Sequence, residues 1–375
     1  MEISKGVKYF IITFGCQMNK SDSERIATIL ENQGYQPASK ENEADLIVAN
    51  MCSVRQSAVD RVYGLSPKFK KLKEKNKKLK TILTGCILKE DRKKLKNIFE
   101  LILDIKDLPN WSKNLQYHRL VCGTISGSIN YLNIPPKYRN NFSAFVPISN
   151  GCNWACTYCV VPLVRGPLFC RNHEEILEEV ENVVKKELNP IRNKISNGAR
   201  EIWLLGQNVN DYQSPTDPSI NFAKLLKMIN DIPGNFKVLF TSPHPKNFSD
   251  ELIETLAQCE KFGRYLNLPV QSGDNKILKK MNRPYTIEQY KNLVKKIREK
   301  IPDINLSTDV IVGFPGETKK QFGNTVKLFK GIKFNYAYIA KYSPRPGTTA
   351  FKLKDNVPLV EKKQREKCLR NLLSS

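Results

Sequence analysis

Residues 151–166 of this 375-residue chain read Gly-Cys-Asn-Trp-Ala-Cys-Thr-Tyr-Cys-Val-Val-Pro-Leu-Val-Arg-Gly, and they decide how the rest of the sequence is interpreted. Within this stretch Cys152, Cys156 and Cys159 have a C-x3-C-x2-C spacing. Thiolates this close together can bind three irons of a 4Fe–4S cluster, which in electron-transfer proteins usually takes four cysteines. The next cysteine, Cys170, lies eleven residues beyond Cys159, so we expect the fourth iron to lack a protein thiolate.

The missing fourth thiolate matters because an iron without one can bind a substrate. In the radical SAM enzymes, S-adenosylmethionine (SAM) chelates that iron through its amino and carboxylate groups, and residues 151–166 resemble their cluster loop. A structural zinc site is one alternative, but zinc usually takes four ligands in paired C-x2-C or Cys/His knuckles, which are not present here. Three unconnected buried thiols are the other, although chance rarely produces this spacing. We therefore predict a radical SAM 4Fe–4S cluster on Cys152, Cys156 and Cys159, and regard Cys170 as a spare thiol.

Before this loop, residues 1–108 alternate between strand-like and helix-like segments. Apolar runs of strand length predict strands, and helical spacing of apolar residues predicts helices between them. The predicted strands are 7–14, 45–50, 80–84 and 101–105, and the predicted helices are about 21–33, 55–65 and 88–98. This α/β order predicts an N-terminal domain with a parallel sheet and right-handed crossovers, flavodoxin-like in outline.

One cysteine follows each of the first three predicted strands: Cys16, Cys52 and Cys86. Ligands of such sheets bind beyond the carboxyl ends of the strands, so we expect the three thiols to converge at one edge. Cysteine is also among the residues most often buried, so three unrelated core thiols are the alternative. The repeated position favours a second metal site, again with three protein ligands and room for an open iron.

After this domain, residues 109–143 have poor periodicity and include Pro135-Pro136 and Asn140-Asn141, which predicts a linker. A C-terminal domain over 144–375 follows. Its strand-like runs are 145–149, 201–205, 236–241, 265–269, 306–312 and 336–341. Sequential strands with intervening helices predict a partial (β/α)6 barrel, with its chemistry at the carboxyl ends of the strands.

Polar and glycine-rich segments come directly after these strands, where we expect them to surround the cofactor. From them we predict SAM contacts by Gln207, Asn208, Ser242, Gln271, Gly313 and Pro315. His244 lies between two prolines and is predicted to be a structural turn residue. No Ser-His-Asp, Walker or HExxH pattern occurs, so no catalytic residue is assigned beyond the cluster ligands.

The chain is strongly basic, with 61 Lys and Arg against 37 Asp and Glu and a formal charge of +24. Basic contacts to phosphates dominate nucleic-acid affinity, which favours a polyanionic partner. The alternative is that the charge only keeps the protein soluble. We expect RNA contacts from the lysine-rich run 68–80 and from the basic stretch 360–375. No signal peptide or apolar run of roughly 18 residues occurs, so we predict a cytoplasmic protein whose cysteines bind metal.

Together these motifs resemble the radical SAM methylthiotransferases, most closely the MiaB type, from about Val7 to Leu373. The loop 151–166 matches the family's cluster loop, and Leu-Leu-Gly-Gln-Asn-Val-Asn at 204–210 is typical of the MiaB branch. The other matching segments are Gly-Cys-Gln-Met-Asn at 15–19, Cys-Ser-Val-Arg at 52–55, Gly-Cys at 85–86, Leu-Pro-Val-Gln-Ser-Gly at 268–273 and Val-Gly-Phe-Pro-Gly-Glu at 312–317.

The resemblance implies a tRNA-modifying enzyme. The family's target is C2 of an N6-prenylated adenosine at tRNA position 37, beside the anticodon, in a loop whose bases can be splayed out. SAM at the 151–166 cluster would give a 5′-deoxyadenosyl radical. Sulfur would come from an auxiliary 4Fe–4S cluster on Cys16, Cys52 and Cys86, and its methyl group from a second SAM. The implied partners are tRNA, an electron donor such as flavodoxin or ferredoxin, and sulfur or cluster delivery proteins, with no membrane.

Other functions fit the same motifs less well. Methylthiolation of threonylcarbamoyladenosine in tRNA, or of an aspartate in a ribosomal protein, uses the same chemistry, but residues 15–19 and 207–210 favour the prenyladenosine branch. An inactive, cluster-bearing RNA-binding protein is opposed by the intact triads. Two departures from the family are expected to matter little for this assignment. A stretch around Leu188–Ser196 is predicted to be a surface insertion, and no counterpart of the family's RNA-binding TRAM domain follows, so we expect tRNA to be held differently.

Overall fold

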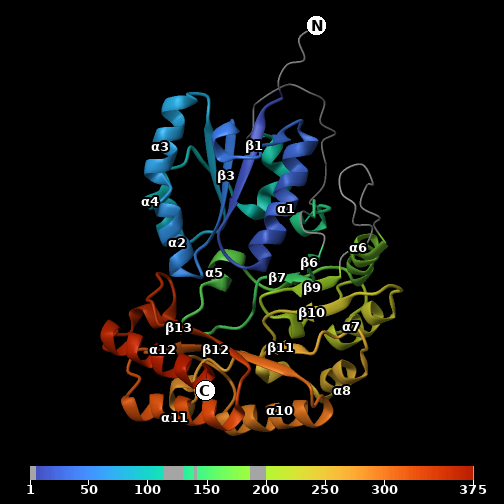
Figure 1. The fold of residues 1–375 in the computed structure, drawn as a ribbon, viewed down its shortest axis with the longest axis vertical. Helices are drawn as coiled ribbons and strands as arrows, with labels where there is room; N and C mark the ends of the chain where they lie inside the picture. The colour runs from blue at the N-terminus through green and yellow to red at the C-terminus, as the bar shows by residue number, and fades with distance from the viewer. Residues whose placement is uncertain (1–5, 114–129, 139–141, 186–199, 375) are drawn as a thin grey trace. The chain divides into compact units, whose positions relative to one another are not determined.

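The computed structural model describes residues 6–113, 130–138, 142–185 and 200–374. The chain forms two compact units, Met1–Asn140 and Asn141–Ser375, coloured blue to teal and green to red in Figure 1. The predicted insertion around Leu188–Ser196 lies outside the described residues. In the described part of the chain, no helix combines the length and the apolar character needed to span a membrane.

The N-terminal unit is built on a parallel sheet. Its described strands are β1 (Lys8–Thr13), β2 (Gln36–Pro37), β3 (Leu46–Cys52), β4 (Lys80–Cys86) and β5 (Leu101–Ile102). They lie in the order β2-β1-β3-β4-β5, and each neighbouring pair is parallel. This is the strand order of flavodoxin-like sheets, which confirms the predicted fold of this part of the chain.

Helices cover both faces of this sheet, because the side chains of a strand alternate between the faces. The described helices are α1 (Gln17–Asn32), η1 (Glu41–Glu43), α2 (Gln56–Tyr63), α3 (Ser66–Lys75), α4 (Lys89–Leu95), η2 (Ile105–Lys113) and η3 (Tyr131–Asn133). Val48 and Ile82 pack with α1, η2 and η3, whereas Ile47 and Leu83 pack with α2, α3 and α4. Figure 1 shows α1 on one side of β3, and α2, α3 and α4 on the opposite side.

Two features of this unit differ from the sequence-based expectation. Helix α1 begins at Gln17 instead of near Ser21, because Cys16 is its N-cap and forms a capping box with Asn19. Trp111 and Leu132 come from the segment 109–143 that was expected to be a linker, yet both are completely buried in the core. Their burial explains why the compact unit extends to Asn140.

The C-terminal unit is an open barrel of parallel strands. In the described residues these are β6 (Ser143–Pro147), β9 (Glu201–Leu205), β10 (Lys237–Phe240), β11 (Tyr265–Asn267), β12 (Asn305–Val312) and β13 (Tyr336–Lys341). They form parallel sheets of order β6-β9-β10 and β11-β12-β13, joined by an isolated bridge between Val238 and Phe262. Within the described residues β13 does not pair with β6, which confirms the predicted partial barrel.

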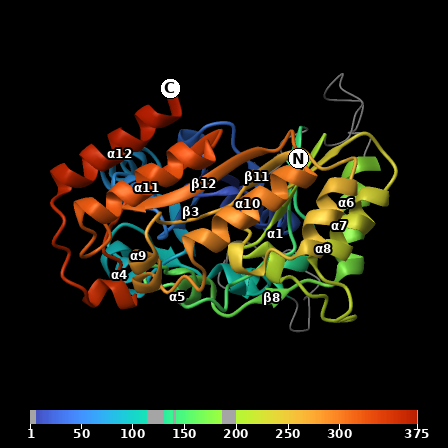
Figure 2. The ribbon, with the colours of Figure 1, turned by 90° about the horizontal axis from the view of Figure 1, so that it is seen from below.

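Helices form the outer layer of this barrel. The long ones are α6 (His173–Lys185), α7 (Phe222–Asp231), α8 (Asp250–Gln258), α10 (Ile287–Lys300), α11 (Lys319–Ile332) and α12 (Leu359–Ser374). Shorter ones are α5 (Val161–Arg165), η4 (Val209–Asp211), η5 (Pro245–Asn247), α9 (Asn275–Lys280) and η6 (Thr349–Lys352). Figure 2 shows α6, α7 and α8 grouped on one side of this unit and α11 and α12 on the other.

The last helix corrects one expectation. The stretch 360–375 was expected to be a basic tail, but α12 packs against β12, β13 and α11. Leu369 is completely buried, and Lys362 and Arg365 are each only 4% exposed. Because Leu369, Lys362 and Arg365 are buried against the rest of the unit, this helix is part of the barrel's outer layer.

Candidate functional site

The three cysteines of the N-terminal unit lie together at one edge of the sheet. Cys16 follows β1 as the N-cap of α1, and Cys52 and Cys86 are the last residues of β3 and β4. Cys52 and Cys86 are direct partners in the strand register, and the N–H of Ser53 donates to the carbonyl of Cys86 over 2.7 Å. The topology thus brings together thiols that are distant in the sequence.

Two buried asparagines hold this edge in place. The side-chain amide of Asn19 donates to Asn50 Oδ1 at 3.0 Å and to the carbonyl of Met51 at 3.1 Å. The amide of Asn50 donates back to the carbonyl of Asn19 at 2.8 Å, and Asn19 Oδ1 accepts the N–H of Cys16 at 3.3 Å. Neither asparagine has exposed surface. The pair therefore fixes the Cys16 turn against the end of β3, a role that the sequence motif at 15–19 did not reveal.

The chain passes very close to itself beside Cys16. Gly15 has φ +146°, and a Cβ at this position would lie 2.8 Å from the Cβ of Cys52, so only glycine fits. The pKa of the Cys52 thiol is lowered, first because the Cys86 side chain hydrogen-bonds to it and further because the N–H groups of Val54 and Arg55 do so. Donors directed at sulfur favour the thiolate, which is the form that binds metal.

The second triad lies on a loop of the C-terminal unit that is closed by a short antiparallel ribbon. Strand β7 (Ser149–Asn150) pairs with β8 (Phe169–Cys170), and α5 lies inside the loop. Gly151 has φ +84°, and a Cβ there would lie 2.0 Å from the carbonyl oxygen of Pro167. A side chain is therefore excluded where the loop closes. Cys170 is opposite Ser149 in this ribbon, outside the C-x3-C-x2-C segment.

The middle of the loop is fastened to the segment that follows α9. The N–H of Thr157 donates to the carbonyl of Met281 at 3.1 Å, and its hydroxyl donates to the carbonyl of Lys280 at 2.9 Å. The side chain of Asn282 donates to the carbonyl of Ala155, also at 2.9 Å. The cluster loop is therefore positioned by residues far along the chain.

Two donors approach the sulfur atoms of this loop. The N–H of Val161 lies 3.4 Å from Cys159 Sγ, and a guanidinium nitrogen of Arg283 lies 3.5 Å from Cys156 Sγ. Arg283 is 8% exposed, and its other terminal nitrogen donates to the carbonyl of Pro269. Hydrogen bonds to sulfur tune iron–sulfur clusters. Sequence reasoning missed Arg283 because it is 127 residues from Cys156.

Burial governs the pKa values of these thiols. Desolvation raises the pKa of Cys152, and it raises the pKa of Cys159 to about 12. As thiols they hold their protons at neutral pH. A coordinated metal ion reverses this balance, because a coordinating thiol is deprotonated outright.

Both triads consist of cysteines without disulfide partners among the described residues, the residue type that binds iron–sulfur clusters. Within the described ranges, no three His, Cys, Asp or Glu side chains are arranged to hold one metal ion. In a cubane each cysteine thiolate binds a different iron, so its ligands stand further apart than those of a single ion. Both triads offer three thiols, sulfur-directed donors and a glycine at the closest approach of the chain. Their role as cluster ligands stays a prediction that this geometry supports.

The residues predicted to contact SAM lie after the barrel strands. Gln207 accepts the N–H of Gly151 through its side-chain oxygen, which places it against the cluster loop. Ser242 and Gln271 have positive φ values of 56° and 69°, which are uncommon outside glycine and concentrate at functional sites. Asn208 is buried, and its Oδ1 has no hydrogen-bond partner among the described residues.

Gly313 and Pro315 occupy the turn after β12. The N–H of Gly313 donates to Glu317 Oε2 at 2.6 Å, and Pro315 is buried. Glu317 in turn forms a buried ion pair with Arg365 of α12 at 2.6 Å. The turn is therefore braced by the last helix. Whether these two residues, or the four before them, contact SAM stays a prediction.

An aromatic pair that the sequence did not indicate lies beside the cluster loop. The rings of Trp154 and His244 stack with centroids 4.4 Å apart and planes 1° apart. Trp154 Nε1 donates to Asp211 at 2.9 Å, and the His244 ring accepts the N–H of Lys246 at 3.3 Å. Desolvation lowers the pKa of His244 to about 3, so the imidazole is neutral. This geometry agrees with the structural turn role predicted for His244.

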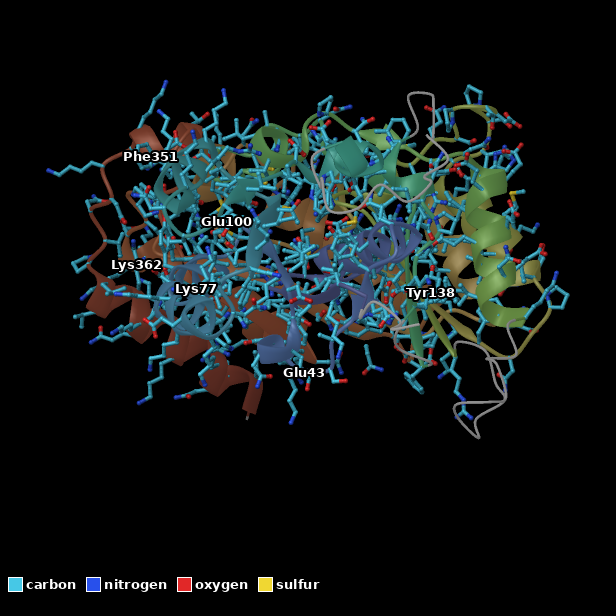
Figure 3. All side chains as sticks on the ribbon, turned by 90° about the horizontal axis from the view of Figure 1, so that it is seen from above. Glu43, Lys77, Glu100, Tyr138, Phe351 and Lys362 are labelled. Atoms are coloured by element: carbon cyan, nitrogen blue, oxygen red, sulfur yellow. The ribbon has the colours of Figure 1, made fainter. Side chains whose placement is uncertain are left out.

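Part of the basic charge expected to contact RNA is paired within the fold. In the lysine-rich run 68–80, Lys68 pairs with Glu41, and Lys73 and Lys80 both pair with Glu100. Figure 3 labels Glu100, together with Lys77 of the same run. In and beside α12, the pairs are Lys362–Asp355, Arg365–Glu317 and Arg370–Glu366. Lys362 and Arg365 are buried in these pairs, which removes them from a surface that could contact RNA. Lys363, Lys367 and Arg370 are exposed, and their contact with RNA stays a prediction.

Family models match both units. The radical SAM superfamily model matches residues 146–329, and the model described as uncharacterized protein family UPF0004 matches residues 8–104. The first contains the triad of the loop and the second contains all three strand-end cysteines.

Curated relatives are similar over nearly the whole chain. A tRNA-2-methylthio-N(6)-dimethylallyladenosine synthase of Clostridium botulinum is 41% identical over 361 residues, 94% of this chain and 78% of the relative. A synthase of the same name from Carboxydothermus hydrogenoformans is 42% identical over 367 residues, covering 95% and 81% of the two chains. One from Acetivibrio thermocellus is 40% identical over 378 residues, covering 97% and 76%.

Solved structures with low sequence identity share the fold. The cobalamin-dependent S-adenosylmethionine radical enzyme OxsB matches with a TM-score of 0.61 at 12% identity, covering 99% of this chain and 56% of that one. The radical S-adenosylmethionine methyltransferase TsrM from Kitasatospora setae matches with a TM-score of 0.56 at 13% identity, covering 92% and 74%.

Proposed function

The chain belongs to the family of tRNA-2-methylthio-N(6)-dimethylallyladenosine synthases, the MiaB-type radical SAM enzymes, and we propose from this premise how its two cysteine triads divide the work. It is a radical SAM methylthiotransferase that acts on tRNA, with SAM and a 4Fe–4S cluster as cofactors. The observation that carries this conclusion is identity of 40–42% to such synthases over at least 94% of the chain. The target is C2 of an N6-prenylated adenosine, and the finer assignment to position 37 beside the anticodon is part of the proposal.

In the C-terminal unit, Cys152, Cys156 and Cys159 would hold the cluster to which SAM binds. When bound, that cluster supplies the electron that cleaves SAM and produces a 5′-deoxyadenosyl radical. The protein's own contribution is position and exclusion of water. Thr157 fixes the loop to the segment after α9, and Arg283 directs its guanidinium at Cys156. Gln207 would orient SAM from its place against Gly151.

In the N-terminal unit, Cys16, Cys52 and Cys86 would hold a second 4Fe–4S cluster that serves as the source of the inserted sulfur. Support comes from the convergence of three strand ends and from the buried asparagine pair that fixes their spacing. The protein's role here is to exclude water from the cluster and to hold it in a fixed position. Cys52 is 2% exposed and Cys86 is 4% exposed.

The same chemistry requires partners beyond tRNA. An electron donor such as flavodoxin or ferredoxin would reduce the C-terminal cluster, and sulfur or cluster delivery proteins would restore the N-terminal one. The names of the relatives point to prenylated adenosine and do not favour threonylcarbamoyladenosine or a ribosomal aspartate.

Nucleoside mass spectrometry of tRNA tests this function. Cells that lack their own synthase accumulate the prenylated nucleoside, and expression of this chain is expected to convert it to the 2-methylthio form. The Cys152→Ala variant, produced at the same level, is the matched control and is expected to convert none. Conversion of threonylcarbamoyladenosine alone, or no change in any tRNA nucleoside, would refute the proposed substrate.

A further inference from the structure

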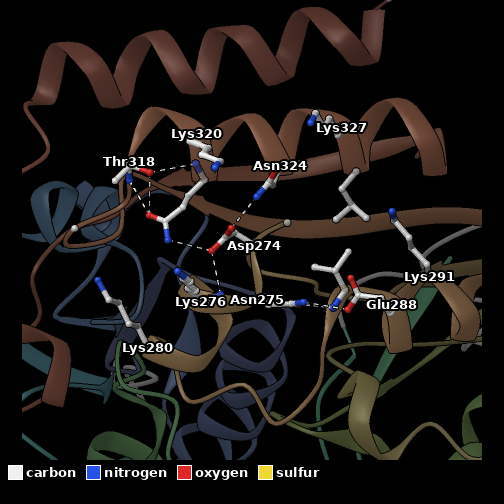
Figure 4. Close-up of a pocket in the computed structure, with 15 residues that line it drawn as sticks. Asp274, Asn275, Lys276, Lys280, Glu288, Lys291, Thr318, Lys320, Asn324 and Lys327 are labelled. Carbon is white, nitrogen blue, oxygen red and sulfur yellow. Dashed lines mark hydrogen bonds between the residues drawn. The ribbon is translucent and has the colours of Figure 1, made fainter.

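A basic groove lies on the outer rim of the barrel, between the segment after β11 and helix α11. Its volume is about 770 Å³, and Figure 4 shows it in close-up. Its basic lining residues are Lys276, Lys280, Lys291, Lys320 and Lys327. All five side chains are exposed, and they come from three helices, α9, α10 and α11. Their convergence therefore results from the fold and not from a run of lysines in the sequence.

Two long helices begin at this groove. Helix α10 is capped by Thr286, and helix α11 is capped by Thr318, each through a capping box. Helices carry positive partial charge at their N-termini, so both ends add to the potential of the lysines. The carboxyl ends of β11 and β12 lead directly into the lining, which puts the groove on the same rim as the predicted cofactor segments.

The two carboxylates of the groove are already engaged by uncharged donors. Asp274 accepts the N–H groups of Lys276 and Ile277 and the side-chain amides of Gln321 and Asn324 at 2.8 to 3.1 Å. Glu288 accepts the side-chain amide of Asn275 at 3.0 Å. Figure 4 shows the bonds between Asp274 and Asn324 and between Glu288 and Asn275 beside the lysines. The carboxylates thus serve the local fold.

The lysines themselves have no acidic partner. Among the described residues, none of the five ammonium groups forms an ion pair within 4.0 Å, although Lys291 lies near enough to Glu288 to lower the pKa of that carboxyl as a minor contribution. Elsewhere on α10 the pattern is different. Lys296 pairs with Asp250 and Lys300 with Glu254. On helix α10, lysines away from the groove therefore form ion pairs, whereas Lys291 in the groove forms none within the described part of the chain.

The groove is structurally continuous with the cluster loop. The carbonyl of Lys280 accepts the hydroxyl of Thr157, which lies between Cys156 and Cys159. The ammonium group of Lys280 also lies beside Gly316, in the turn after β12, where an added Cβ would approach it to 2.9 Å. A polyanion held in the groove would therefore pass along the edge of the proposed SAM site.

We propose that this groove binds the phosphate backbone of the substrate RNA and sets how the target adenosine approaches the barrel mouth; this inference rests on the proposed tRNA-modifying function. Five exposed lysines without ion pairs to described residues, against two carboxylates, give the open groove a net positive charge that matches a chain of phosphates, and such contacts dominate nucleic-acid affinity without reading the sequence. Base selection is left to the barrel interior, since single-stranded loops present bases that can be splayed out. Inorganic phosphate shares the chemistry and is the alternative occupant.

The test compares two variants that each lose four positive charges. The groove variant carries Lys276→Gln, Lys291→Gln, Lys320→Gln and Lys327→Gln. The control carries Lys224→Gln, Lys227→Gln, Lys237→Gln and Lys295→Gln, which are exposed lysines of the same unit that do not line the groove. Affinity for tRNA is measured across a salt series, with iron content and the thermal unfolding midpoint as checks of folding. Each phosphate contact contributes about 0.7 to 0.9 to the slope of log affinity against log salt. The groove variant is expected to lose roughly three units of slope and the control less than about one.

Three outcomes would overturn the proposal. Equal losses in both variants would mean that net charge alone governs binding. An unchanged slope in a folded groove variant would assign RNA binding to another surface. Binding of inorganic phosphate to the wild-type chain, lost in the groove variant while tRNA affinity stays constant, would make the groove a free-anion site. Methylthiolation by the wild-type chain is assayed in parallel to separate this proposal from the proposed enzymatic function. If the chain binds tRNA through the groove but methylthiolates no tRNA, only the proposed enzymatic function is refuted.

Discussion

The two cysteine triads are built in opposite ways. In the N-terminal unit, Cys16, Cys52 and Cys86 come from three strand ends and meet only because the sheet places β1, β3 and β4 side by side. In the C-terminal unit, the residues from Cys152 to Cys159 form one short loop closed by the β7–β8 ribbon. One site is therefore assembled by the fold and the other is encoded locally.

Because the two sites are built differently, different kinds of substitution are expected to disrupt them. The assembled site depends on packing between elements, which is why buried Asn19 and Asn50 cross-link the Cys16 turn and the end of β3. The local site has its spacing in the sequence and depends instead on what surrounds it, namely Thr157 anchoring the loop and Arg283 contacting sulfur. Substitutions outside the cysteines should therefore affect the two sites by different routes.

The largest expected effect is on iron content. After anaerobic reconstitution the chain should hold roughly eight irons, from two cubanes. Replacing Cys152, Cys156 and Cys159 together by Ala should leave about four, and replacing Cys16, Cys52 and Cys86 should leave the other four, because each triad binds its own cluster. Iron and sulfide assays with Mössbauer spectroscopy measure this. Full iron content in either triple variant, or zinc in the wild-type chain, would contradict the comparison.

Arg283→Gln should have the next largest effect, confined to the local site. The substitution removes a charged donor 3.5 Å from Cys156 Sγ, and loss of such a partner around a metal site typically costs about 10- to 100-fold in affinity or activity. SAM cleavage to 5′-deoxyadenosine is the readout, with the iron of the N-terminal triad unchanged. Arg264→Gln, which removes a surface guanidinium paired with Asp303, is the matched control. A rate for Arg283→Gln equal to that of the control would remove Arg283 from the site.

Asn50→Ala should weaken the assembled site through stability. It removes one of the two acceptors of the buried Asn19 amide and the side-chain donor to the Asn19 carbonyl, and loss of such buried partners typically costs about 1 to 3 kcal/mol. Denaturant unfolding of the N-terminal unit measures the loss, and iron bound by its triad should fall while SAM cleavage persists. Asn97→Ala, at an exposed position of the same unit, is expected to cost less than about 0.5 kcal/mol. Equal stabilities of the two variants would show that the asparagine pair does not support the site.

The smallest effect is expected for a cysteine just outside the local site. Cys170→Ser changes a thiol that is opposite Ser149 in the ribbon and outside the C-x3-C-x2-C segment. Iron content and SAM cleavage should both equal those of the wild-type chain. A loss of about one cluster's worth of iron would instead make Cys170 a fourth ligand and would close the iron at which SAM is proposed to bind.

Sequence patterns predicted the elements that depend on local information. The Gly-Cys motifs, the strand-end positions of Cys52 and Cys86 and the alternating order of strands and helices led to the correct fold of both units. Residues 360–374 form a helix, as expected, but the burial of Arg365 was missed because composition shows that the stretch is basic and not that Glu317 lies opposite Arg365 across the fold. For the same reason Trp111 and Leu132 looked like linker residues.

The parts of the site that could not be predicted are those made by distant contacts. Arg283 reaches Cys156 across 127 residues, and Trp154 meets His244 by stacking between two loops. No spacing in the sequence indicates either contact. The lysines of the rim groove are similarly scattered from Lys276 to Lys327, so only the folded chain shows that they share one cavity.

Product analysis of two single variants tests the division of roles most directly. Reactions with reductant, SAM and prenylated tRNA are analysed for 5′-deoxyadenosine and for the 2-methylthio nucleoside. Cys152→Ala should form neither product, because the iron site for SAM is lost. Cys52→Ala should still form 5′-deoxyadenosine but no 2-methylthio nucleoside, because only the sulfur source is lost. Normal methylthiolation by Cys52→Ala, or SAM cleavage by Cys152→Ala at the wild-type rate, would contradict the assignment of separate roles to the two triads.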